Sequence, residues 1–334
     1  MDKKRWLAWF LGLLIFVILL WKLDFARHWE ILLDLHPSWF LIAVVLFVLS
    51  QFLIYLKWKI MYSATMDRGS QPLLPIFSSI VVCGMLSPAR SGDIIVSLGW
   101  RRIQGKVLAW SIFNRITEGG TTLVLSLFIL GVFFSSYLAS TYWILMAVIL
   151  FLISLIVFLS FHQKSGLIIC SWVKGFLQRF NGIAIIDRLF KYEEAIERHV
   201  VLFYQTMEIF RARRVLVLLI GVTLVKRATV IVMAMAILMA IGVRLPLLTV
   251  LGILAAMWMS VILSPVPGGI GIGDIAPGLI LSILGFQAQA GPYIVLNRFF
   301  ELMMVLFWGM MWWGSIRVQS RTGEIRGNEV DPCQ

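Results

Sequence analysis

An Asn-Arg-x-x-Glu motif occurs twice in the chain, at residues 114–118 and again at residues 297–301. Both copies lie inside long apolar runs, where an ionisable side chain is costly and usually has a function. Because residues three apart share one face of a helix, we expect the arginine and glutamate of each copy to pair. Such pairs either line a substrate site or serve as purely structural ion pairs. The candidate residues are Asn114, Arg115, Glu118, Asn297, Arg298 and Glu301.

A second repeated motif precedes each of these copies. Leu-Ser-Pro at 86–88 is followed by Gly-Asp-Ile at 92–94, and the same two elements return at 263–265 and 273–275 with four extra residues between them. One order at nearly one spacing indicates an internal duplication, although a duplication can also serve only to build a stable scaffold. Proline and glycine interrupt the backbone in both copies, at Pro88, Gly92, Pro265, Pro267 and Gly271.

Charged residues next to these breaks are candidates for binding an anionic headgroup. Arg90 lies in the first break, while Gly268 and Gly269 in the second allow close approach of the backbone. A helix that starts near Asp274 would point its positive end into the break, where a phosphate could bind. Asp93 and Asp274 are expected to cap helices, and proton transfer is the alternative role. Glu118 and Glu301 are further candidates for proton coupling or ion pairing.

Lys226 and Arg227 lie midway along another apolar run, too deep to extend easily to the membrane surface. We expect them either to bind a lipid phosphate or to pair with Asp274 and Glu301. Their role is electrostatic in both cases.

Positioning these groups requires membrane-spanning helices. The chain is 60% hydrophobic and only 14% charged, far from the balance of a soluble protein. Its apolar runs suit helices rather than a barrel. We predict an all-α polytopic membrane protein with about six full spans and two re-entrant helical hairpins. The predicted spans are Trp6–Leu23, read as a retained anchor, Ser38–Leu56, Val107–Phe134, Tyr142–Phe161, Val215–Ile241 and Tyr293–Ile316; the hairpins begin with Leu73–Ser87 and Leu247–Ser264.

Lysine and arginine concentrate in alternate loops, which places both termini in the cytoplasm. With this orientation, the first hairpin enters the membrane from the cytoplasm and the second enters from outside. The two repeats are therefore predicted to have inverted topology, as in many transporters, and the protein to lie in the cytoplasmic (inner) membrane. The predicted units are 1–35, an anchor helix and external segment; 36–140, repeat 1; 141–213, a connecting helix and basic segment; 214–318, repeat 2; and 319–334, a cytoplasmic tail.

The 164–214 stretch interleaves basic, acidic and aromatic residues. This pattern is typical of amphipathic helices on the inner leaflet, and docking of a partner protein is the alternative. The net charge of +12 is explained by topology and by anionic lipids, so we expect no nucleic acid. Three separated cysteines form no disulfide framework or zinc motif. We expect no catalytic group, cofactor or metal ion.

These motifs resemble those of a known family. Pro88-x-Arg90-x-Gly92-Asp93 and Pro267-Gly268-Gly269-Ile-Gly271-Ile-Gly273-Asp274 are similar to the P-x-R-x-G-E and PGG-x-G-x-x-E motifs of the lysylphosphatidylglycerol synthase transmembrane-region family. That family includes the flippase portion of the multiple peptide resistance factor proteins. Both family glutamates are aspartates here, shorter by one methylene. The resemblance covers roughly 35–320 and implies translocation of a polar-headed lipid between leaflets. Synthase activity is not expected, because the sequence ends at Gln334 without the soluble synthase domain.

The sequence therefore favours a lipid flippase or transporter. Its partners would be anionic or polyprenyl-phosphate lipids, with a homo-oligomer and a soluble lipid-synthesis protein as further possibilities. Two alternatives stay open. One is an intramembrane enzyme that acts on a lipid phosphate or glycolipid, and the other is a non-transporting membrane partner of a lipid synthase.

Overall fold

The computed structural model describes residues 17–18, 21, 29–66, 73–87, 92–99, 103–133, 193–264 and 266–322, and the regular elements of this part of the chain are all helical. The predicted spans Trp6–Leu23 and Tyr142–Phe161 lie largely and entirely, respectively, outside these residues. The helices are η1 (Trp29–Leu32), α3 (Pro37–Thr65), α4 (Leu73–Met85), α5 (Gly92–Gly99), α6 (Gln104–Phe133), α10 (Glu193–Arg211), α11 (Arg213–Ala240), α12 (Leu247–Leu263), η3 (Pro267–Gly269), α13 (Ile272–Ile283) and α14 (Gln287–Thr322).

Three helices in the described part of the chain are long and apolar enough to cross a membrane, namely α3, α11 and residues 287–315 of α14. Only 22% of the most apolar stretch of each is buried within the protein, which suits helices whose remaining surface faces lipid. All three coincide with predicted spans. The predicted span Val107–Phe134 overlaps α6, which is not one of these three helices, so that it crosses the membrane stays a prediction. The total number of spans stays a prediction.

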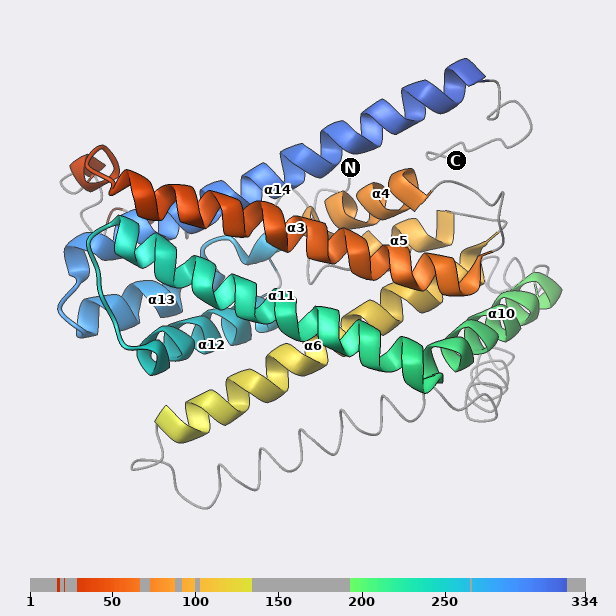
Figure 1. Cartoon of the computed structure of the whole chain (residues 1–334), viewed down its shortest axis with the longest axis horizontal. Coiled ribbons are helices and arrows are strands. Elements are labelled where there is room, and N and C mark those ends of the chain that lie inside the picture. The colour runs from red at the N-terminus through yellow and green to blue at the C-terminus, as the bar shows by residue number, and fades with distance from the viewer. Residues whose placement is uncertain are drawn as a thin grey trace, which may run out of the picture.

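The helices α3 and α11 pack side by side and run in opposite directions (Figure 1). Their antiparallel register is fixed at one end, where the backbone N–H of His36, just before α3, donates to the carbonyl of Ala240 at 2.9 Å. This bond satisfies a carbonyl in the last turn of α11, which has no partner within its own helix.

Each helix of this antiparallel pair is followed by two shorter helices joined at a break: α4 and α5 follow α3, and α12 and α13 follow α11. In the first pair, α5 comes so close to α4 that a Cβ added to Gly92 would lie 2.1 Å from the carbonyl oxygen of Cys83. In the second pair, α13 packs against α12. Both helix pairs match the expected hairpins; that they are re-entrant stays a prediction.

The serine of each Leu-Ser-Pro motif stabilises its break. The Ser87 hydroxyl accepts a hydrogen bond from the N–H of Gly92 at 2.6 Å, and the Ser264 hydroxyl accepts one from Val266 at 3.1 Å. A backbone N–H outside a regular helix needs such a partner where water is scarce. In both repeats the serine of the Leu-Ser-Pro motif therefore provides the hydrogen-bond acceptor for a backbone N–H at the break.

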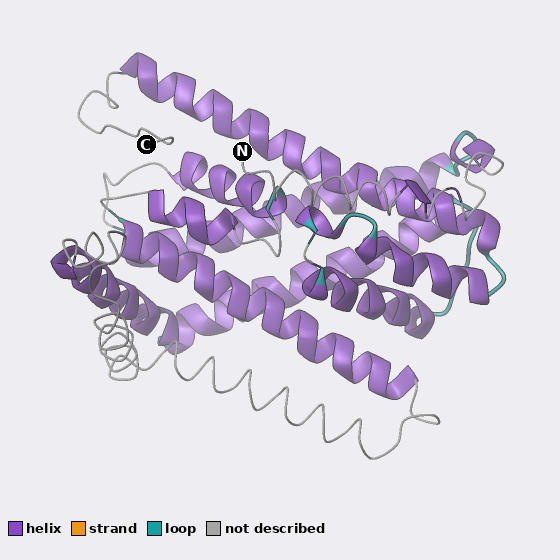
Figure 2. Ribbon diagram, turned by 180° about the vertical axis from the view of Figure 1, so that it is seen from behind, coloured by secondary structure: helices purple, strands orange, loops and turns teal. Residues whose placement is uncertain are grey.

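The first helix of each hairpin packs against a long helix of the other repeat. Helix α4 packs against α14, and α12 packs against α6, as the two opposite views show (Figures 1 and 2). Phe77 of α4 and Trp308 of α14 meet edge to face with ring centroids 4.5 Å apart. Between the hairpins, a Cβ added to Gly268 would lie 3.6 Å from the carbonyl oxygen of Met85. The two breaks therefore meet inside the molecule.

Helix α10 lies within the basic 164–214 stretch and packs against α6. Met207 and Phe210 are fully buried, and the rings of Phe210 and Phe113 are 4.7 Å apart. At these residues the apolar side of the predicted amphipathic segment therefore contacts α6 rather than the membrane surface.

Candidate functional site

Arg298 organises the break of the second hairpin. Its Nε lies 2.9 and 3.0 Å from the two carboxylate oxygens of Asp274. Its Nη1 donates to the Gly268 carbonyl at 2.9 Å and pairs with Glu301, and its Nη2 donates to the Gly269 carbonyl at 3.0 Å. The expected Arg298–Glu301 pair is thus present, within a larger arrangement that also fixes the hairpin. We call these five residues the Arg298 centre.

The local sequence explains why the carbonyls are available to Arg298. Gly268 and Gly269 have φ values of 62° and 68°, a left-handed conformation that glycine adopts without steric cost. Asp274 lies in the first turn of α13 and accepts a hydrogen bond from the N–H of Gly271 at 3.0 Å. Asp274 therefore makes the expected capping contact while it binds Arg298. Its side chain is only 1% exposed.

The first repeat contains the same arginine–aspartate contact. Arg115 of α6 donates from Nε to Asp93 at 2.9 Å, and its Nη2 forms an ion pair with the same carboxylate. Asp93 also accepts a hydrogen bond from the N–H of Ile94 at 2.8 Å. In both repeats the arginine of Asn-Arg-x-x-Glu therefore holds the aspartate of the preceding hairpin. Pro88, Arg90 and Pro265 lie outside the described residues.

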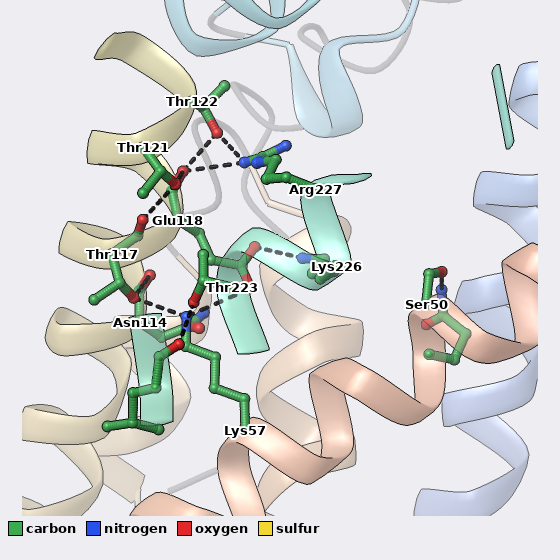
Figure 3. A network of polar contacts seen from close by, with 12 residues as sticks. Ser50, Lys57, Asn114, Thr117, Glu118, Thr121, Thr122, Thr223, Lys226 and Arg227 are labelled. Carbon is green, nitrogen blue, oxygen red and sulfur yellow. Dashed lines mark hydrogen bonds and ion pairs between the residues drawn. The ribbon is translucent and has the colours of Figure 1, made fainter. Parts of the chain in front are cut away.

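The sequence predicted that Glu118 pairs with Arg115 on the same helix; the ion pairs that we describe for Glu118 are with lysines of two other helices. Its Oε2 is 2.5 Å from the Nζ of Lys226 on α11, and its Oε1 is 3.7 Å from the Nζ of Lys57 on α3 (Figure 3). Lys57 donates instead to the hydroxyl of Thr117 at 2.7 Å. One carboxylate from α6 thus joins the first helices of both repeats. We call these four residues the Glu118 cluster.

Arg227 follows Lys226 and binds the next turn of α6. Its Nη2 donates to the backbone carbonyl of Glu118 at 3.0 Å and to the Thr122 hydroxyl (Figure 3). Its guanidinium carbon lies 4.7 Å from the ring centre of Trp258, a distance that allows cation–π attraction. We expected Lys226 and Arg227 to pair with Asp274 and Glu301 or to bind phosphate. The ion pair of Lys226 and the hydrogen bonds of Arg227 given above are with α6 of the first repeat.

Sequence reasoning missed Lys57. It lies just past the predicted span Ser38–Leu56, yet α3 continues through it to Thr65 and its side chain is only 1% exposed. A signal existed, since Trp58, Ile60 and Met61 extend the apolar run beyond Lys57, interrupted only by Lys59. A lysine at the end of an apolar run is nevertheless most simply read as a topology signal.

The two asparagines behave differently from one another. Asn297 donates to the sulfur of Met257 at 3.4 Å. The side-chain oxygen of Asn114 is buried and accepts no hydrogen bond from the described residues. Asn114 lies one turn before Glu118, so this acceptor belongs to the surroundings of the Glu118 cluster. Among the described residues, no group of three or more His, Cys, Asp or Glu side chains is placed to hold a metal ion.

Fold and site together define a helical, multi-pass membrane protein whose buried charges gather around two broken hairpins. The chain belongs to the family described as the lysylphosphatidylglycerol synthase TM region, whose model matches residues 7–309. This family is a membrane domain of lipid-related proteins, the non-catalytic, flippase-like region. Comparisons with curated proteins and with solved structures gave no match.

Proposed function

We propose that this protein moves a polar-headed, phosphate-bearing lipid between the leaflets of the cytoplasmic membrane. The observation that carries the proposal is that arginine–aspartate pairs hold two broken hairpins that meet inside the molecule, while a mostly buried lysine–carboxylate pair joins α6 to α11. Such groups are costly at membrane depth and are usually retained for a polar substrate or an ion.

The balance of charge favours an anionic headgroup. Among the residues that the structure describes, the site contains five cationic side chains and four carboxylates, so its formal charge is positive. A lipid phosphate would offset that excess, while its hydrocarbon tails stay in the membrane. The residues counted are Lys57, Arg115, Lys226, Arg227 and Arg298 against Asp93, Glu118, Asp274 and Glu301.

The opposed directions of α3 and α11, together with the exchanged packing of α4 and α12, support an inverted-repeat architecture. In transporters of this kind, substrate binds near the midplane where broken helices meet. Both termini would then be cytoplasmic. An ion gradient or the lipid gradient itself would drive movement, with Asp93, Glu118, Asp274 and Glu301 as candidate proton carriers. A homo-oligomer and a lipid-synthesis partner that docks on 164–214 stay predictions.

Reconstitution tests the proposal directly. Purified protein in liposomes that contain a fluorescent phospholipid should expose inner-leaflet lipid to an external quencher faster than empty liposomes do. Arg298→Ala removes the contacts to Asp274 and to the break, and we expect a loss of at least about tenfold in rate. Arg244→Ala changes an exposed residue outside the site and is the control.

Two outcomes would contradict transport. One is a rate no higher than in empty liposomes for both phospholipid and polyprenyl-phosphate probes. The other is a new lipid species, detected by mass spectrometry, that forms with pure protein; this would indicate an enzyme.

A further inference from the structure

The Glu118 cluster has one carboxylate between two ammonium groups, and the carboxylate lies much closer to one of them than to the other. Glu118 lies 2.5 Å from Lys226 but 3.7 Å from Lys57. The oxygen that faces Lys57 is buried and accepts no hydrogen bond from any residue that the structure describes. Lys57 donates to Thr117 instead. The Glu118 carboxylate therefore lies within ion-pair distance of both lysines, but only its contact with Lys226 is short.

We propose that Glu118 occupies the position of a lipid phosphate, and that the phosphate displaces its carboxylate from Lys226 and Lys57. This inference rests on the proposed function and names the subsite in which the headgroup binds. A tetrahedral phosphate presents oxygens in several directions and can accept hydrogen bonds from two separate ammonium groups at once. Charge-assisted bonds of this kind are stronger than bonds between neutral groups.

Electrostatics makes the exchange selective for anions. If the Glu118 carboxylate left alone, two buried lysines would lose their counter-charge, which is strongly unfavourable. A phosphate that arrives as the carboxylate departs avoids that cost. A neutral headgroup does not, so it cannot displace Glu118.

Burial indicates the order in which the lysines are reached. The side chains of Lys226 and Glu118 are 13% and 14% exposed, whereas Lys57 is 1% exposed. The incoming phosphate therefore meets Lys226 first and Lys57 only after Glu118 has moved. Arg227 binds the backbone of α6 at Glu118, so the helix stays in place while the side chain changes partner.

Asn114 extends the description of the headgroup. Its buried side-chain oxygen has no hydrogen-bond partner within the described part of the chain and lies one turn before Glu118. A buried acceptor is costly without a donor. A hydroxyl or ammonium group beside the phosphate would supply one. The substrate class is thus a phospholipid with a hydrogen-bond donor in its headgroup.

Ligand-dependent thermal stability of the detergent-solubilised protein tests the exchange. The probes are dioctanoyl phosphatidic acid, dioctanoylglycerol with the same tails and no phosphate, and inorganic phosphate. A ligand that binds the folded state raises the unfolding temperature, and the concentration dependence gives an apparent Kd. We expect stabilisation by the phosphatidic acid alone. Equal stabilisation by dioctanoylglycerol or by inorganic phosphate would overturn the proposal.

Variants of the carboxylate and of the lysines should change the apparent Kd for phosphatidic acid in opposite directions. Glu118→Gln removes the competing carboxylate and should lower the apparent Kd for phosphatidic acid by about fivefold or more. Lys226→Met and Lys57→Met should each raise it by at least about tenfold. Lys59→Met changes an exposed lysine on the same helix and should leave it unchanged. Each shift is measured from the variant's own unliganded midpoint, so lower stability does not imitate weaker binding.

Unchanged or weaker binding by Glu118→Gln would show that Glu118 is only a structural ion-pair partner. Native mass spectrometry of the same samples counts the bound lipid directly, so lipid binding is also measured without a thermal unfolding transition. If binding follows the expected signs but liposomes show no lipid movement, transport is wrong and the exchange stands. If lipid moves while Glu118→Gln leaves the Kd unchanged, the exchange is wrong and transport stands.

Discussion

Arg298 satisfies two carboxylates and two backbone carbonyls with one planar guanidinium group. This is a task for arginine in particular, because its donors point in fixed directions from a rigid fork. The break of the second hairpin has its carbonyls turned toward that fork. Arg298 therefore positions the backbone in addition to pairing with Asp274 and Glu301.

Arg298→Lys should therefore destabilise the protein although the charge is kept. A single ammonium group cannot reach Asp274, Glu301, Gly268 and Gly269 together, so we expect a loss of about 2 kcal/mol or more in the free energy of unfolding. Thermal unfolding in detergent measures the loss. Arg244→Lys at an exposed position should change little, and an equally small effect at Arg298 would contradict the role given to its geometry.

At the scale of single residues, sequence reasoning found one of the two local pairs that it predicted, and it did not find contacts between helices. The Arg298–Glu301 pair follows from helical spacing alone. The contact between Arg115 and Asp93 joins two helices, and no periodicity within one helix reveals such a contact. The same holds for Lys57, whose partners lie on α6.

The short helices α4 and α5 depend on a backbone approach that only glycine permits. The carbonyl of Cys83 lies where a Cβ on Gly92 would be. Ser87 then receives the hydrogen bond from Gly92 that fixes the break. One glycine and one serine therefore set how closely the two helices of this hairpin approach.

Gly92→Ala should separate α4 from α5. The added Cβ would lie 2.1 Å from a backbone oxygen, so the helices must shift, and we expect a loss of about 2 kcal/mol or more in stability. Gly119→Ala is the matched control, since a Cβ there meets nothing within 4 Å. In the interior of α6 it should stabilise the protein by about 0.5–1 kcal/mol. Thermal unfolding of both variants measures the two effects, and equal effects would contradict the close approach of the Cys83 carbonyl to Gly92.

The existence of these elements was predictable, since the hydrophobic runs and Pro/Gly breaks are explicit in the sequence. Their ends were not. Helix α3 continues to Thr65, past the predicted end at Leu56, because packing against neighbouring helices supports Lys57 and Trp58 in a helix. Tertiary contacts of this kind leave no signal in local composition.

Across the whole molecule, the two hairpins follow the opposite ends of the antiparallel pair α3 and α11 (Figure 1). Buried apolar residues form one cluster around the C-terminal half of α11 and another around the C-terminal half of α3. If the pair crosses a membrane, the two hairpins belong to opposite faces.

Cysteine labelling tests this orientation. In a background with Cys83, Cys170 and Cys333 replaced by serine, Leu284→Cys between α13 and α14 should react with a membrane-impermeant maleimide in intact cells. Met66→Cys at the end of α3 should react only after permeabilisation. The reason is that the opposed helices place these positions on different faces. Labelling of both in intact cells would contradict inverted topology.

The contact between Phe77 and Trp308 has a consequence for biosynthesis. The ribosome completes the first hairpin long before it reaches α14, so α4 must wait beside the membrane-inserted helices without its final neighbour. Contacts between segments so far apart in the chain form late and slowly. The face of α4 that carries Phe77 therefore lacks one of its aromatic neighbours until the last long helix has been made.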